Sequence, residues 1–267
     1  MPTPIMHLAL AEQILRRDDL PPAIHRLLSQ QRGPFLLGHT APDVQTVSGQ
    51  TREGTHFYTI PRTSARPAHE ALFTVHPALA HPEVLPPAQV AFVTGYVAHL
   101  LLDELWLDDV YLPYFVGQAW GTRRERQFSH NVLRTWMDHQ DQQRLNGSVT
   151  VALRAAAPRN WLPFVGDEYL RAWRDWLVEQ LSPGQAVQTA EVFAQRMGIP
   201  AAEVETVLHS PQQMEERIFR RIPRSALDAF HDTGYTRTVV LITGYLGEYH
   251  QQPTYLSAHL LETRRST

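Results

Sequence analysis

Apolar residues recur at intervals of three or four positions along most of the chain, which is the spacing of amphipathic helices. Between residues 4 and 17, for example, Ile5, Leu8 and Ile14 follow this spacing, and Pro4 suits the first turn of a helix. The same period predicts further helices over residues 22–31, 124–145, 148–157, 167–181, 187–197, 201–208, 213–221 and 235–249.

One segment is divided by Gly and Pro and does not follow a helical period. It reads GPFLLGHTAPDVQTVSGQTREGTHFYTIPRT and covers residues 33–63. We expect a brief helical turn there, followed by a long loop. Long loops in compact domains are usually functional or disordered, and the aromatic pair Phe57 and Tyr58 argues against disorder. No segment shows the alternation typical of strands, so the sequence predicts an all-α fold.

The most apolar segment begins after Pro87 and contains the stretch GYVAHLLLDELWLDD, residues 95–109. A helix there would place His99 and Asp103 one turn apart on the same face. Burying such groups costs several kcal/mol unless partners or a metal ion compensate. The pair is therefore either a buried hydrogen bond between His and carboxylate or part of a metal site.

Composition limits the remaining explanations. The 267 residues are 43% hydrophobic and 19% charged, which is typical of a globular protein with one large domain or two smaller ones. A formal net charge of −3 provides no bulk attraction to nucleic acid or anionic lipid. Cys is absent, so a metal ion would have to be bound by His, Asp and Glu. We recognise no signal peptide and no transmembrane segment, and we expect a cytoplasmic protein.

Two further potential ligands lie in the segment rich in Gly and Pro. Asp43 is part of the motif GHTAPD, and His56 is part of GTHFY. Taken singly, Asp43 could be a turn residue and His56 a surface histidine. Together with His99 and Asp103 they form a set of two histidines and two carboxylates, which suits Zn²⁺ or another divalent ion.

The order of these motifs resembles the zinc-dependent phospholipases C of bacteria, all-helical enzymes related in fold to secreted zinc nucleases that cleave single strands. The resemblance rests on a histidine in the first helix, followed by GHTAPD, THFY and GYVAHLLLDELW, and it covers roughly residues 5–140. Each motif is short, so their order along the chain carries the resemblance. It implies a phospholipase C/P1 nuclease-like fold that binds one to three divalent ions.

The resemblance also implies roles for individual residues. Asp43, His56, His99 and Asp103 match the residues that form the most complete zinc site of the family, in which the last carboxylate bridges to a second ion. Asp43 is then the candidate to orient or deprotonate the attacking water.

Other metal ligands of the family are matched less completely. His7 and His130 match histidine ligands of further ions, and Asp109 stands where the family usually has another histidine. The family has a glutamate four residues after the later histidine, but this chain has Arg134 there, and a guanidinium cannot ligate a cation. We therefore expect one complete metal site and one or two altered ones.

Two motifs suggest other functions. The stretch AEVFAQRMGIPAAEVETVL has the pattern of a helix-turn-helix, but Glu203 and Glu205 on its second helix would face phosphates with the wrong charge. The pair His231 and Asp232 is also found in HD phosphohydrolases, but no accompanying ligand pattern precedes it here, which favours a structural role. Neither motif indicates a nucleic-acid partner or a second catalytic centre.

The sequence therefore predicts a zinc-dependent hydrolase of phosphodiesters, acting on a small phosphoester or a phospholipid headgroup. The alternative is a metal-binding or scaffold protein of the same fold that has lost turnover. Residues 1–146 would form the metal-binding region, and residues 147–267 would form a helical extension packed on it.

Overall fold

A computed structural model describes residues 1–181 and 189–247. These residues contain helices and no strand, which confirms the expected all-α fold. Residues 187–188, which begin one expected helix, and residues 248–249, which end another, lie outside the described residues. The longer helices are α1 (Pro4–Arg16), α2 (Pro22–Gln30), α3 (Arg32–Gly38), α6 (Ala68–Val75), α7 (Pro87–Trp106), α8 (Arg123–Gln142), α9 (Gly147–Ala155), α10 (Asp167–Gln180), α11 (Thr189–Met197), α12 (Ala201–Leu208) and α14 (Arg224–Leu246).

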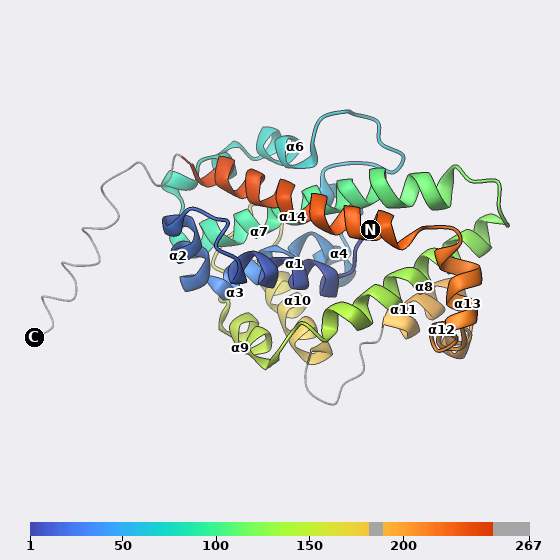
Figure 1. Cartoon of the computed structure of the whole chain (residues 1–267). Coiled ribbons are helices and arrows are strands. Elements are labelled where there is room, and N and C mark those ends of the chain that lie inside the picture. Colours follow the sequence, from blue (N-terminus) through green and yellow to red (C-terminus); the bar gives the residue numbers. More distant parts are fainter. Residues whose placement is uncertain (182–188, 248–267) are drawn as a thin grey trace, which may run out of the picture.

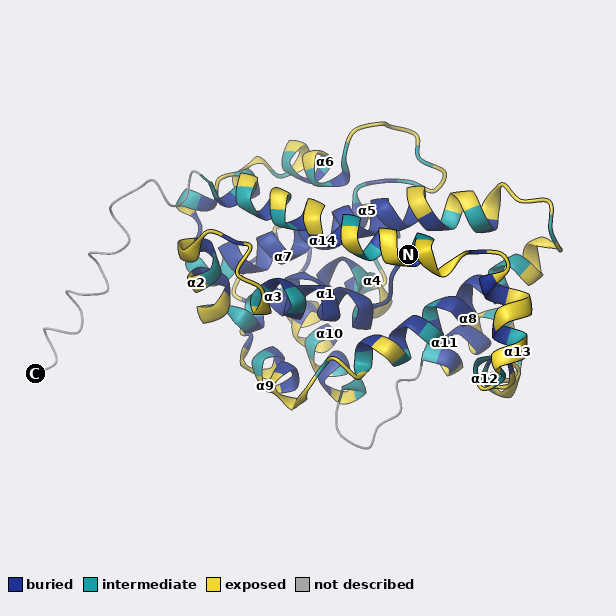
Figure 2. Ribbon diagram, viewed as in Figure 1, coloured by how far each residue is buried: buried dark blue, intermediate teal, exposed yellow. Residues whose placement is uncertain are grey.

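Helix α7 is the buried centre of the protein, and it is covered by α1, α3, α6 and α14 (Figure 1). Every residue from Val90 to Trp106 is buried, as the dark ribbon in Figure 2 shows. A π-helix, η4 (Leu107–Val116), continues α7 without a break. The segment Pro87–Val116 is apolar and long enough to cross a membrane, but buried core helices have the same properties, so this is weak evidence for a span.

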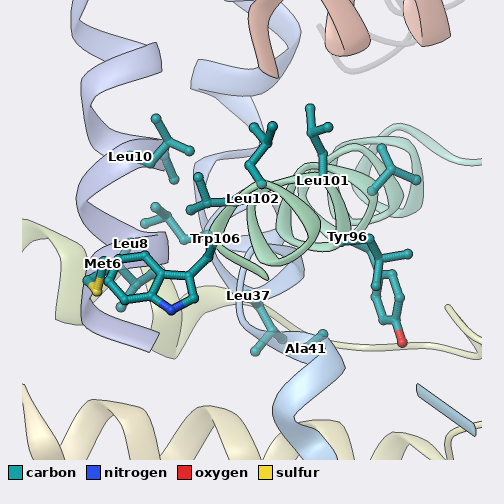
Figure 3. Packing of buried hydrophobic residues seen from close by; sticks show 14 of the residues in the cluster. Met6, Leu8, Leu10, Leu37, Ala41, Tyr96, Leu101, Leu102 and Trp106 are labelled. Atoms are coloured by element: carbon teal, nitrogen blue, oxygen red, sulfur yellow. The ribbon is translucent and has the colours of Figure 1, made fainter. Parts of the chain in front are cut away.

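The core around α7 is formed by apolar side chains from several helices. Met6 and Leu8 of α1 belong to the same buried cluster as Leu37 of α3 and Trp106 of α7 (Figure 3). Their burial removes apolar surface from water, which is the main favourable term in folding. The cluster fixes α1 and α3 against α7.

Helices α3 and α7 cross at two glycines, where their backbones are in contact. A Cβ atom on Gly38 would overlap the carbonyl group of Phe92, and one on Gly95 would overlap the carbonyl oxygen of Phe35. A Cβ atom on Gly95 would also lie only 2.8 Å from the backbone nitrogen of His39. Glycine at both positions therefore allows an approach that any side chain would prevent.

The segment 33–63 is more helical than we predicted. After α3 it forms a 3₁₀ turn and two short α-helices, η1 (Ala41–Val44), α4 (Gln45–Ser48) and α5 (Arg52–His56). Elements of four or five residues are too short to produce a periodic pattern, so the sequence could not reveal them. Thr51 caps α5, because its hydroxyl accepts a hydrogen bond from the backbone nitrogen of Gly54.

The last helix also differs from the prediction. It begins at Arg224 instead of residue 235, directly after Pro223, and Gly234 lies inside it. Leu227 and Phe230 are buried in its first turns. Tertiary packing of this apolar face outweighs the low helix propensity of a single glycine.

The helices after residue 147 pack on those before it. Helix α9 lies against α3, α14 runs along α7, and α11 and α12 lie against α8. The remaining short elements are η2 (Pro77–Ala80), η3 (Pro82–Val84), α13 (Pro211–Met214) and η5 (Glu215–Phe219).

Asp138 joins three of these helices through its carboxylate. It lies on α8, is fully buried, and accepts hydrogen bonds from the hydroxyls of Thr3 before α1 and Thr189 on α11. Burial raises the pKa of Asp138 to about 7, although the two hydroxyls oppose this shift. The folded protein therefore holds a proton on Asp138 at pH values where the unfolded chain has released it.

This pKa predicts how stability depends on pH. Between pH 4 and about 7 the Asp138 carboxyl ionises in the unfolded chain but stays protonated in the folded protein. We therefore expect the free energy of unfolding to fall as the pH rises through this range. Asp138→Asn has no carboxyl to ionise, so the stability of this variant minus that of wild type should increase with pH from 4 to about 7 and level off above it. Urea unfolding at several pH values measures the difference. Parallel stability curves for the two proteins would contradict the prediction.

Candidate metal centre

Five ionisable side chains from four elements meet beside α7. Helix α7 provides His99 and Asp103 one turn apart, α1 provides His7, η1 provides Asp43 and α5 provides His56. Their candidate ligand atoms form two groups, each within 4.8 Å, that share His99. One group contains His7, His99 and Asp103, and the other contains Asp43, His56 and His99. The structure thus brings together the four residues predicted for the most complete site, and His7 with them.

Asp103 lies between the three histidines. Its Oδ1 atom is 3.5 Å from Nε2 of His7, and its Oδ2 atom is 3.5 Å from Nε2 of His56 and 3.9 Å from Nε2 of His99. The side chain of Asp103 is only 1% exposed. Burial opposes its ionisation, but the neighbouring side chains, among them the guanidinium of Arg52, hold the pKa of this carboxyl well below its usual range. Asp103 is therefore an anion in the folded protein.

Hydrogen bonds to the outer ring nitrogens orient two of the histidines. Nδ1 of His99 lies 2.9 Å from the backbone oxygen of His39, so the ring donates its hydrogen there. Nδ1 of His56 lies 3.0 Å from the hydroxyl of Thr55, and that hydroxyl has Gln45 as an acceptor. Both rings therefore present the lone pair of Nε2 to the cluster, as histidine ligands of metal ions do.

His99 is uncharged in this environment. Burial, together with the neighbouring ring of His7, lowers the pKa of His99 to about 3. The two rings are stacked, with their centroids 3.7 Å apart and their planes 11° from parallel. A neutral imidazole is the form that binds a metal ion.

The facing atoms of the cluster have no hydrogen-bond partner among the described residues. These buried atoms include Nε2 of His7, His56 and His99 and Oδ1 of Asp103. Leaving one buried polar atom unpaired costs about 1–3 kcal/mol, so four at one place need an explanation. A divalent ion fits, because imidazole nitrogens and carboxylate oxygens are ligands of Zn²⁺ and related ions.

Asp43 is the carboxylate of the cluster that reaches water. Its side chain is 23% exposed, and its Oδ1 atom lies 3.6 Å from Nε2 of His56. Burial of the carboxyl opposes its ionisation, but the nearby side chains of His56 and His99 lower the pKa of Asp43. This side chain can hold a solvent molecule next to the buried ligands.

Arg52 and Tyr58 also contact Asp103. Nη2 of Arg52 donates to Oδ2 of Asp103 over 2.6 Å and to the hydroxyl of Tyr58 over 2.7 Å. The hydroxyl of Tyr58 in turn donates to the same Oδ2 atom over 3.2 Å. The second oxygen of Asp103 is thereby held by a cation and a hydroxyl, as expected for the outer shell of a metal site.

The other two predicted ligands do not join the cluster. Nε2 of His130 accepts a hydrogen bond of 3.0 Å from the indole nitrogen of Trp106, and its ring packs against Tyr111 and Phe115. Its lone pair is therefore engaged inside an aromatic part of the core. Asp109 is exposed in η4.

Sequence reasoning missed two residues of the centre. Arg52 lies one helical turn before His56, and this spacing could have drawn attention to it. His39 precedes Asp43 within the motif GHTAPD, and its backbone oxygen, not its ring, contacts Nδ1 of His99. No sequence pattern identifies a backbone contact of this kind.

No protein-family model matches the chain, and comparisons with curated proteins and with solved structures found no match.

Proposed function

We propose that this protein is a metal-dependent hydrolase of phosphodiesters, with Zn²⁺ as the expected ion. The observation that carries the proposal is the set of four buried ligand atoms that face one another and have no hydrogen-bond partner in the part of the chain that the structure describes. Unpaired polar atoms destabilise a purely structural core, and a divalent ion that binds them removes this free-energy cost. The order of sequence motifs typical of zinc-dependent phospholipases C supports the same function and a related fold.

In this proposal the buried residues bind the metal ion, and the partly exposed Asp43 acts on the water. His7, His99 and Asp103 would hold the ion, and His56, which lies beside Asp103, would be the fourth buried ligand. When bound, such an ion lowers the pKa of a water ligand to about 7 and polarises a phosphoryl oxygen.

Asp43 would orient the attacking water and accept its proton, since it is the carboxylate of the cluster with access to solvent. Its lowered pKa keeps it ionised and able to accept a hydrogen bond near neutral pH. Small phosphoesters and phospholipid headgroups are the proposed substrates, because the partly exposed group next to the buried ligands is the polar carboxylate of Asp43.

Hydrolysis of a chromogenic phosphodiester tests this function. We expect the zinc-loaded protein to hydrolyse bis(4-nitrophenyl) phosphate, the chelated protein to be inactive, and Asp43→Asn to lose roughly 100-fold or more in kcat. Zinc content should change little in this variant, because the four buried ligands remain. An assay with Zn²⁺, Mn²⁺ and Fe²⁺ over several diesters measures both properties. Metal binding without turnover on every substrate would contradict hydrolysis and indicate a metal-containing binding protein.

A further inference from the structure

The guanidinium of Arg52 has donors without an acceptor among the described residues. Its Nη2 atom is fully engaged, because its two hydrogens point to Asp103 and to the hydroxyl of Tyr58. Its Nη1 atom is buried and has no hydrogen-bond partner within residues 1–181 and 189–247. Since both atoms belong to one planar group, Nη1 lies beside the carboxylate that would hold the ion.

Arg52 is also held in place from the side. Its guanidinium lies over the ring of Tyr58, 4.6 Å from the centroid, and α5 fixes its backbone one turn before His56. The side chain is 25% exposed although Nη1 itself is buried, so Arg52 stands between the cluster and solvent. An oriented and partly dehydrated guanidinium is well suited to bind phosphate oxygens.

Counting the charges indicates which ligands the loaded centre would attract. Asp43 and Asp103 together offset one divalent ion, and the histidine ligands are neutral when they bind metal. With the positive charge of the Arg52 guanidinium added, these groups together carry a net charge of +1. A phosphodiester carries one negative charge, whereas an uncharged carboxylic ester carries none.

We propose that Arg52 binds an oxygen of the anionic phosphoryl group through Nη1 and so makes the centre selective for phosphate esters over neutral esters. The inference rests on the proposed metal-dependent function and adds to it the residue that recognises the substrate. Arg52 contacts the substrate and Asp103 at the same time, which places the phosphoryl group next to the ion ligands.

Binding of inorganic phosphate to the zinc-loaded protein tests the role of Arg52 without any need for turnover. We expect Arg52→Gln to weaken phosphate binding by roughly 10- to 100-fold in isothermal titration calorimetry, because charge-assisted hydrogen bonds are lost. The phosphate affinity of Arg52→Lys should lie between those of Arg52→Gln and wild type, since lysine keeps the charge but loses the planar fork. Zinc content is measured for every protein in the series.

Arg62→Gln is the matched control. Arg62 is 21% exposed, lies in the connection between α5 and α6, and pairs with Glu104 and Asp108 outside the cluster. The Arg62→Gln variant should bind phosphate with the affinity of the wild type. In parallel, at equal zinc loading, Arg52→Gln should lose a larger factor of activity on bis(4-nitrophenyl) phosphate than on the neutral ester 4-nitrophenyl acetate.

The possible results separate the two proposals. Equal phosphate affinity for wild type and Arg52→Gln, or no phosphate binding by the loaded wild type, would overturn the role of Arg52. A loss of phosphate affinity that disappears once Arg52→Gln is fully loaded with zinc would also overturn it and would show that Arg52 only positions Asp103. If phosphate binding depends on Arg52 but no protein turns over an ester, the inference stands and the hydrolase function fails.

Discussion

Replacement of His99 by alanine is expected to abolish zinc binding. His99 belongs to both groups of ligand atoms, so its loss leaves two ligands in each group. Changing an outer-shell partner of a metal typically weakens affinity 10- to 100-fold, so losing this ligand should cost more than about 100-fold. Elemental analysis after dialysis against metal-free buffer measures the zinc retained by each protein.

His130→Ala provides the control for this experiment. His130 is as buried as His99, but its Nε2 atom is engaged by Trp106 and its ring lies among aromatic side chains. We expect this variant to lose stability and to retain zinc. Equal zinc content in wild type and His99→Ala would instead show that the histidines form a metal-free buried cluster.

Replacement of Gly95 by alanine is expected to destabilise the fold more than other single-methyl additions. The new Cβ would overlap the carbonyl oxygen of Phe35 and approach the backbone nitrogen of His39, and neither backbone atom can rotate away. Separating the two helices should cost about 3 kcal/mol or more, which lowers Tm by about 6 °C or more in a chain of this size. Thermal unfolding followed by circular dichroism measures the shift.

The same substitution should also disturb the metal centre. Gly95 lies one turn before His99, and moving α3 away would lengthen the hydrogen bond from His99 to the backbone oxygen of His39. We therefore expect zinc affinity to fall together with stability in Gly95→Ala.

Gly244→Ala is the matched control for the glycine substitution. Gly244 is exposed on α14, and a Cβ atom there would meet no described residue within 4 Å. Alanine should stabilise this helix by about 0.5–1 kcal/mol, because it restricts the unfolded chain. A similar loss of stability in both variants would mean that the close approach at Gly95 is not responsible.

The sequence by itself determined the all-α fold class. Long helices such as α1 and α8 bury one face, and this burial imposes a period of three to four residues that can be read directly. The same period placed His99 and Asp103 one turn apart on a central helix. Local geometry alone decides that relation, so no knowledge of the packing was needed.

The sequence could not determine the short elements or the length of the last helix. Helices α4 and α5 contain four and five residues, which is less than two turns and produces no period. Helix α14 continues through Gly234 because its apolar face packs along α7. In both cases contacts with distant residues outweigh the local signal.

Only the tertiary structure decided which candidate ligands meet. His130 has the same burial and residue type as His99, but α8 directs it toward Trp106 and the aromatic core, whereas α1 and α5 bring His7 and His56 to Asp103. The close crossing at Gly38 and Gly95 also brings the backbone of His39 within reach of His99. These relations depend on how helices far apart in the sequence pack, and residue spacing along a single helix contains no information about them.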